Sequence, residues 1–263
     1  MRSLSIAATG MQAQQLNVDV ISNNIANINT TGYKRRRAEF QDLLYQDQLR
    51  VGTNSSADGT IVPAGVQIGL GVKTAAVYPI MQQGTLVETD NKLDLAIQGK
   101  GFFQVKLPDG TNAYTRAGSF QLSNTGQIVT ANGYVVQPGL TIPSNALNIS
   151  IDQSGEVMVT LPGQTQPQTV GQLTLATFPN EAGLTALGDN LLQDTQASGQ
   201  VSLGVPGTPG FGTVSQGFLE QSNVNVVQEI TNLITAQRAY EMNSKVIEAS
   251  DQMLSTVNQL QQG

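Results

Sequence analysis

The chain of 263 residues contains no cysteine, no histidine and no tryptophan. Without cysteine it has no disulfide bond, no zinc–thiolate site and no thiol nucleophile. Without histidine it lacks the commonest general base, the commonest metal ligand and every Ser-His-Asp or Cys-His arrangement. An enzyme built on this chain would have to work with carboxylates, lysine, tyrosine or serine alone.

Charge is also scarce. Only 12% of the residues are charged, against about 25% in an average globular protein. A surface with so little charge suits a protein that packs against copies of itself. The net charge is −6, which argues against nucleic acid as a partner because phosphate binding requires clustered lysine and arginine.

Long apolar runs are missing as well. No stretch stays apolar for the roughly 18 residues that a membrane span requires, so no span is predicted. The opening "MRSLSIAATGMQAQQ" has a short apolar part broken by serine, threonine and glycine, which does not match a signal peptide. These features alone favour a soluble cytoplasmic protein, an expectation that the resemblance described below changes.

A seven-residue repeat predicts a helix from residue 3 to about residue 30. Two series of residues, offset by three, form the apolar seam of a coiled coil. The first series is Leu4, Met11, Val18 and Ile25, and the second is Ala7, Gln14, Ile21 and Ile28. Gly32 follows where a glycine is expected to end the helix. The asparagines of "ISNNIANIN" are predicted to form hydrogen bonds where helices crowd together, without the desolvation cost of a charge.

A second helix is predicted from about 224 to 260, with Asn225 or Asn223 as its N-cap. Its apolar repeat consists of Val226, Leu233, Tyr240, Ile247 and Leu254. The two helices are interpreted either as a pair that closes one globular domain or as a pair that also packs against other subunits. The second interpretation is favoured, because solvated coiled-coil faces carry glutamate and lysine that are scarce beside the first seam.

The middle of the chain is predicted to be all-β. Short β-type runs alternate with turn signals at "PDG" (108–110), "NTG" (124–126) and "ANG" (131–133). The polar, glycine-rich stretch 51–72 is too long for a simple connection and predicts an extended arm. The fold class is therefore α+β in four parts: helical segment 1–44, arm 45–73, β-rich domain 74–221 and C-terminal helix 222–263.

No chemical motif is convincing, and no cofactor or metal site is predicted. "GLGVKT" (69–74) and "GKG" (99–101) lack the spacing of a phosphate-binding loop. Asp90, Asp94, Asp109 and Asp152 are scattered and lie mostly in turns, where aspartate is common for local reasons. The basic run "YKRRR" (33–37) is interpreted as a solvated or salt-bridged turn rather than a nucleic-acid or lipid contact, because Glu39 and Asp42 follow it.

Both ends of the chain resemble one family. "ISNNIANINTTGYKRRRAEF" (21–40) and "SNVNVVQEITNLITAQRAYEMNSKVIEASDQML" (222–254) look like the terminal signatures of bacterial flagellar rod and hook proteins. The central "LDLAIQGKGFFQV" and "AYTRAGSF" also match that family, in the expected order. Hook proteins usually have a larger middle region, so a place in the distal rod fits best, with a proximal rod or hook-type subunit as the alternative.

The resemblance implies a structural protein and no enzyme. It implies export through the flagellar type III apparatus without a cleaved signal peptide, then polymerisation into a hollow helical rod across the periplasm. Terminal helices would line the tube, the β domain would form its outer layer, and the arm would reach a neighbouring subunit. The rod would pass motor torque to the hook. Implied partners are copies of the chain, other rod proteins, the hook protein and the surrounding basal-body rings, with no nucleic acid and no membrane span.

On this interpretation the apolar seams are the assembly interface. The expected interface residues are Leu4, Met11, Val18, Ile21, Ile25, Ile28, Val226, Leu233, Tyr240, Ile247 and Leu254. Gly32, Tyr33 and Lys34 are expected to form a joint between the layers of the tube. Two other classes stay open: a cell-wall hydrolase that uses carboxylates, and a monomeric β-rich binding module.

Overall fold

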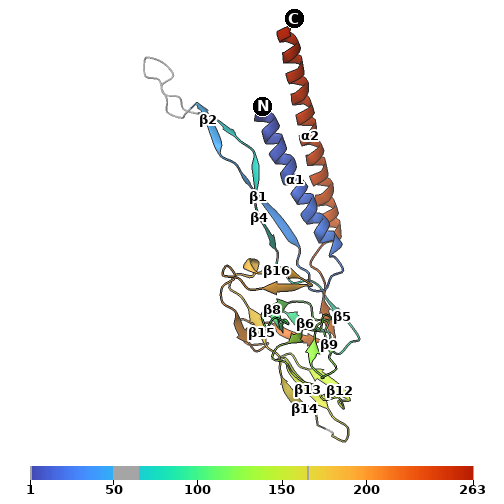
Figure 1. Cartoon of the computed structure of the whole chain (residues 1–263). Helices are drawn as coiled ribbons and strands as arrows, with labels where there is room; N and C mark the ends of the chain where they lie inside the picture. The colour runs from blue at the N-terminus through green and yellow to red at the C-terminus, as the bar shows by residue number, and fades with distance from the viewer. Residues whose placement is uncertain (1, 50–64, 165, 263) are drawn as a thin grey trace. The chain divides into compact units, whose positions relative to one another are not determined.

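A computed structural model describes residues 2–49, 65–164 and 166–262, shown in Figure 1. Helix α1 spans Arg2–Ala26 and helix α2 spans Val226–Gln262, with β-strands and one short 3-10 helix, Glu181–Gly183, between them. The α+β class with two helices and a central all-β region is confirmed. None of the described helices combines the length and the apolar character that crossing a membrane would need.

The chain divides into two compact units. The helical unit comprises the described residues within Met1–Ile25, Arg36–Tyr78 and Val226–Gly263, and the β unit comprises Ala26–Arg35 and Pro79–Asn225. The strands of the helical unit are β1 (Arg36–Asp42), β2 (Tyr45–Leu49), β3 (Val66–Gly69) and β4 (Val72–Pro79), the last residue of which belongs to the β unit. The predicted division of the chain into four parts stays a prediction.

In the helical unit, α1 and α2 run side by side in opposite directions (Figure 1). Ser250 Oγ lies 3.3 Å from Ser3 Oγ, and Asn24 Nδ2 donates to Glu229 Oε2 at 3.2 Å. A Cβ atom on Gly10 would lie 2.9 Å from Asn243 Nδ2. In each of these three pairs the residue numbers add to 253, so one antiparallel register holds along the whole contact.

Two thin β-ribbons complete the helical unit. Strand β1 pairs with β4, and β2 pairs antiparallel with β3, with Tyr45 opposite Gly69. Thr9 Oγ1 on α1 accepts a hydrogen bond from Val72 N at 3.3 Å, which joins the ribbon to the helix. Both ends of the predicted arm are therefore paired strands, whereas its residues 50–64 lie outside the described part of the chain.

Helix α1 ends at Ala26, earlier than the predicted residue 30, and Gly32 lies six residues further on. Thr30 donates through its hydroxyl to Asn27 Oδ1 and through its N–H to Asn27 O. Such local bonds of asparagine and threonine compete with helical ones and end the helix. Ile28 consequently lies in this turn rather than on the helix. Gly32 has φ +68° and its Cβ would lie 2.6 Å from Ala117 N, so a larger residue would not fit there.

The strands of the β unit are short, and those that pair in its sheets do so antiparallel. They are β5 (Leu86–Glu88), β6 (Leu95–Gln98), β7 (Phe102–Lys106), β8 (Asn112–Thr115), β9 (Gln121–Leu122), β10 (Ile128–Val129), β11 (Val135–Val136), β12 (Asn148–Ile151), β13 (Glu156–Thr160), β14 (Gln168–Gln172), β15 (Leu175–Thr177), β16 (Thr185–Gly188), β17 (Leu191–Gln193), β18 (Ser202–Gly204), β19 (Thr213–Gln216) and β20 (Phe218–Glu220). The largest sheet has the order β16-β17-β8-β7-β11-β10-β9. Strand β15 pairs with the first two residues of β7, on the edge that faces away from β8 and that β11 also uses, and β18 pairs with β15. A three-stranded sheet β12-β13-β14 and the pairs β19-β6 and β20-β5 complete the unit.

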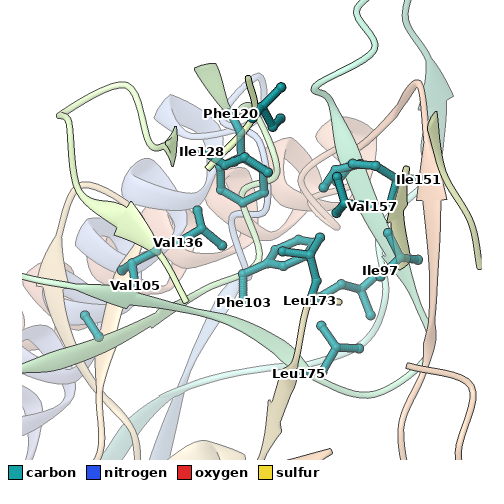
Figure 2. Close-up of a cluster of buried hydrophobic side chains, with 14 of the residues drawn as sticks. Ile97, Phe103, Val105, Phe120, Ile128, Val136, Ile151, Val157, Leu173 and Leu175 are labelled. Carbon is teal, nitrogen blue, oxygen red and sulfur yellow. The ribbon is translucent and has the colours of Figure 1, made fainter. Parts of the chain in front are cut away.

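The core of the β unit gathers around strand β7. Phe103 is fully buried and meets Phe120 edge-on, with ring centroids 5.0 Å apart. Figure 2 shows Ile97, Leu173 and Leu175 turned toward the same cluster. Phe102 packs in a second cluster with Tyr114 and Phe178. Strand β7 is thus buried on both faces, which accounts for its two adjacent phenylalanines.

The three predicted turns are confirmed. Gly110, Gly126 and Gly133 all have positive φ, which glycine adopts without a steric penalty. The first joins β7 to β8, the second β9 to β10 and the third β10 to β11. These glycines therefore set the registers of three successive hairpins around the core.

Candidate assembly surfaces and a buried charge cluster

Helix α1 meets α2 through small and polar side chains. The contacts involve Ser3, Gly10 and Asn24, spaced by multiples of seven. They directly precede the predicted seam residues Leu4, Met11 and Ile25, respectively. One residue corresponds to a rotation of about 100° around the helix axis. The α1–α2 contact is therefore closer and more polar than an apolar seam would make it.

Asn24 holds a central position in this contact and is 1% exposed. Its side chain bonds the backbone of Arg36 twice, accepting from N and donating to O at 2.8 Å each, in addition to the bond to Glu229. Asn24 therefore forms a hydrogen bond where α1 meets α2, while asparagine bonds among several crowded helices stay a prediction.

The predicted interface residues are not all placed alike. Ile21 is buried, whereas Val226 and Tyr240 are each 40% exposed. The remaining residues are half-buried: Leu4, Met11, Val18, Ile25, Ile28, Leu233, Ile247 and Leu254. Within one copy of the chain these side chains keep surface that another molecule can cover, and their part in assembly stays a prediction.

Helix α2 also has an apolar outer face that the repeat did not identify. Its exposed residues are Val227, Ile230 and Ile234 near the start and Met242, Val246 and Met253 further along. Their spacing of three, four and seven gathers each group on one side of the helix. At about 100° per residue, the first group lies on the side of α2 opposite Glu229, which faces α1. In the second group, Val246 and Met253 lie only about 60° from Asn243 and Ser250, which also face α1, so they flank the contact. The outer face of α2 is therefore the first group. A search for apolar residues spaced three and four apart outside the predicted repeat could have found this face in the sequence.

The ribbons add further exposed apolar side chains. Leu44 is 82% exposed, Tyr45 57% and Val66 47%. A two-stranded ribbon has little stability of its own in water. The exposed side chains of the ribbons and of the outer face of α2 give the helical unit an exposed apolar surface of the kind that marks an interaction site.

The β unit contains a cluster of three buried charges. The carboxylate of Glu220, whose side chain has no exposed surface, accepts from Lys34 Nζ at 2.5 Å and from Arg116 Nε at 2.9 Å. Gly84 N donates to the same carboxylate at 2.9 Å. Arg116 Nη1 donates to the carbonyls of Gly99 and Gly101 at 2.9 and 2.6 Å. Among the described residues, no buried side-chain nitrogen or oxygen is without a hydrogen-bond partner.

Lys34 is the member of the cluster whose charged form burial disfavours. Its ammonium also donates to Gln82 O at 2.9 Å. Burial lowers the pKa of Lys34 below 10.5, although Glu220 acts in the opposite direction. The cluster holds two cations and one anion, so one positive charge is left without a matching negative charge.

The interpretation of "YKRRR" is a solvated or salt-bridged turn, and for Lys34 the second alternative holds: it is 8% exposed and pairs with Glu220. Arg37, in contrast, lies at the surface beside Glu39, 3.5 Å away, and bonds the hydroxyl of Tyr78. Tyr33 is half-buried. No sequence signal marked Arg116 or Glu220, because ion pairs between distant positions leave no periodic pattern. Asn223 is also not a helix cap: its side chain accepts from Arg35 N and donates to Ile80 O and Gln82 O.

The carboxylates considered for hydrolysis serve their own turns. A hydrogen bond from the Thr111 hydroxyl lowers the pKa of Asp109, and one from the Ser154 hydroxyl lowers that of Asp152. Asp94 accepts bonds from Thr89 and Asn91. A general acid requires a raised pKa, so Asp109 and Asp152 are poor candidates. Among the described residues, no group of three or more metal-binding side chains gathers at one place.

Comparison with known proteins covers both ends and the centre of the chain. Residues 4–34 match the model of the flagella basal body rod protein family. Residues 96–159 match the D1 domain of flagellar hook protein FlgE/F/G, and residues 215–260 match the C-terminal region of flagellar basal body rod FlgEFG proteins. The chain is 63% identical over 260 residues to the flagellar basal-body rod protein FlgG of Caulobacter vibrioides, with 99% of each chain covered.

This chain belongs to the flagellar basal-body rod protein family. Its other FlgG relatives include one from Agrobacterium fabrum, 55% identical with 98% of each chain covered. A FlgG protein of Buchnera aphidicola is 54% identical, with 98% of this chain and 99% of its own length covered. The resemblance of the terminal and central motifs to flagellar rod and hook proteins is thereby confirmed, and with it the structural character of the family.

Proposed function

We propose that this flagellar rod protein is a subunit of the distal rod that polymerises with copies of itself into a hollow helical shaft. The shaft would cross the periplasm, turn inside the basal-body rings and pass torque to the hook. Other rod proteins and the hook protein would adjoin it, after export through the flagellar type III apparatus. The subunit would have a mechanical role and no catalytic one.

The apolar outer face of α2 is the observation that carries this proposal. Val227, Ile230 and Ile234 lie on the side of the helix opposite its contact with α1. Burying one such side chain fully is worth about 1.5–3 kcal/mol, which the isolated chain does not gain. Repeated contacts between different faces of identical subunits produce an open helical assembly when the rotation from one subunit to the next does not close a ring.

Ile234→Asp tests the proposal more sharply than a change at Leu233. Leu233 is half-buried, so a charge there would also disturb the isolated chain, whereas Ile234 is 46% exposed. Purified Ile234→Asp is expected to melt like the wild type and to fail to assemble, because assembly would bury an unpaired charge. Leu147→Asp, at an exposed site of the β unit, is the matched control and should assemble normally.

Sedimentation of the purified proteins and cryo-electron microscopy of isolated basal bodies provide the measurements. Rods of normal length and yield in the Ile234→Asp strain would refute the role of this face. A loss of assembly in Leu147→Asp as well would show that added charge at any exposed site is sufficient, and the outer face of α2 would then lend no support to the proposal.

A further inference from the structure

We propose that Lys34 makes the docking of one chain segment on the β unit conditional on the docking of another. The lead segment, residues 27–35, follows α1 in the sequence, and the return segment, residues 218–223, precedes α2. Both belong to the β unit. The inference concerns folding alone and stands whether or not the chain forms the distal rod.

The return segment has an anchor of its own. Strand β20 pairs with β5, and Gln221 N donates to Thr85 O at 2.9 Å. The lead segment, in contrast, bonds the return segment directly: Gly32 N donates to Glu220 O at 2.8 Å and Arg35 N to Asn223 Oδ1 at 2.7 Å. A further backbone bond to the β unit is accepted by Arg35 O, from Ile80 N at 2.9 Å. The two segments are therefore arranged in an order, with one resting on the other.

Charge makes this order strict. The side chains of Lys34 and Arg116 are only 7% and 6% exposed, and Glu220 lies between them. If the lead segment docked without Glu220, two cations would share a buried site in which carbonyl oxygens accept their hydrogen bonds and Glu181 is only a minor influence on Lys34. Like charges in such a site repel, and neither is well hydrated.

Lys34 is the member that imposes the condition. Arg116 also bonds the carbonyls of Gly99 and Gly101 and forms a neutral pair with Glu220. Lys34 adds the surplus positive charge. A chain without Lys34 has only the neutral pair of Arg116 and Glu220 in the cluster. When the carboxylate is also missing, Arg116 keeps its bonds to the two glycine carbonyls, and the lead segment brings no second cation into the site.

The distance in sequence between Lys34 and Glu220 links the docking of the lead segment to the folding of the β unit. Lys34 and Glu220 are 186 positions apart, and the strands of the β unit lie between them in the sequence. The cluster can close only when the far end of that unit is in place. The lead segment, which follows α1, is thus fixed only when the return segment, which precedes α2, is in place.

Amide hydrogen exchange on the full chain, read at Gly32, Arg35 and Gln221, tests the inference. Glu220→Gln should speed exchange of Gly32 and Arg35 by about tenfold or more, because it leaves two buried cations. Adding Lys34→Met to Glu220→Gln should return exchange to within about threefold of Lys34→Met alone. Lys34→Arg, which keeps the charge, should give no rescue.

The rescue separates the proposal from a merely structural role. If Lys34 served only to form hydrogen bonds, its removal from Glu220→Gln would leave exchange as fast or make it faster, and the proposal would be overturned. Rescue by Lys34→Arg as complete as that by Lys34→Met would overturn it too. Should Glu220→Gln fail to fold, the double variant with Lys34→Met must still fold, and its failure would count against the inference.

Discussion

The two units of this rod protein bury different kinds of residue. The β unit encloses large apolar side chains such as Phe103, Phe120 and Ile97, each at most 1% exposed. Helix α1 buries only Ala7, Ala13, Ile21 and Asn24, while the outer face of α2 stays uncovered. Because apolar burial is the main favourable term in folding, the β unit is complete in one copy of the chain and the helical unit is not.

The largest expected effect is in the β unit. Phe103→Ala should lower its free energy of unfolding by about 3–5 kcal/mol, since it leaves a cavity at the centre of the core. Urea unfolding followed by the near-ultraviolet signal of the tyrosines, which include Tyr114 in this unit, measures the change. Leu122→Ala, at a site 40% exposed, should change it by less than about 1 kcal/mol, and equal effects of the two variants would contradict this expectation.

In the helical unit, the substitution with the largest expected loss of stability is at a polar residue, Asn24. Asn24→Leu should destabilise the helix pair by about 2–3 kcal/mol, because the backbone of Arg36 and the Glu229 carboxylate lose a buried partner. Thermal unfolding followed by far-ultraviolet circular dichroism reports the helices. Gln12→Leu, at an exposed position of α1, is the control. A more stable helix pair in Asn24→Leu would show that the contact is apolar in character.

A smaller effect is expected at the close approach of the helices. Gly10→Leu should destabilise the pair by about 1 kcal/mol, since crowding against Asn243 outweighs the gain in helix propensity. Asn243→Ala should restore part of the loss by making room, which the same circular dichroism measurement detects. Additive effects of the two changes would mean that these residues do not meet.

The smallest effect concerns the titration of Lys34. The folded-state pKa of this lysine is lowered below 10.5, so the folded chain binds fewer protons than the unfolded chain at alkaline pH. Stability of the wild type relative to Lys34→Met should therefore rise as the pH increases through the folded pKa toward 10.5. Urea midpoints of both proteins across that range give the comparison, and a fall with rising pH would contradict the assigned cause.

Local signals in the sequence predicted much of this structure. Heptad spacing located both helices, and three turn glycines located the hairpins around β7. The helix seam was less successful, because apolar spacing does not reveal that Ser3, Gly10 and Asn24 allow a closer contact one position away. The small residues themselves recur at heptad spacing, so a search for that pattern could have found the contact.

The buried charge cluster shows where sequence reasoning ends. Lys34 stands out in the sequence as part of a basic run, yet its partner Glu220 lies in a strand with no distinguishing pattern. Whether a lysine is solvated or buried depends on which distant segment returns to it, and neither propensity nor periodicity contains that information. The family resemblance pointed to this region as a joint, but not to its ion pairs.

The constant register of α1 and α2 determines how far α2 extends beyond the start of α1. A slip by one heptad, about 10 Å along the axis, would place small residues opposite small residues again at most positions. Asn24 would then face Ala236 instead of Glu229, and its buried amide would lose that carboxylate. In the observed register Arg2 lies opposite residue 251, so α2 continues beyond α1 from 252 to 262. Asn24 thus fixes the register, and the register fixes the length of α2 that extends past α1. This length is the same in every copy of the chain.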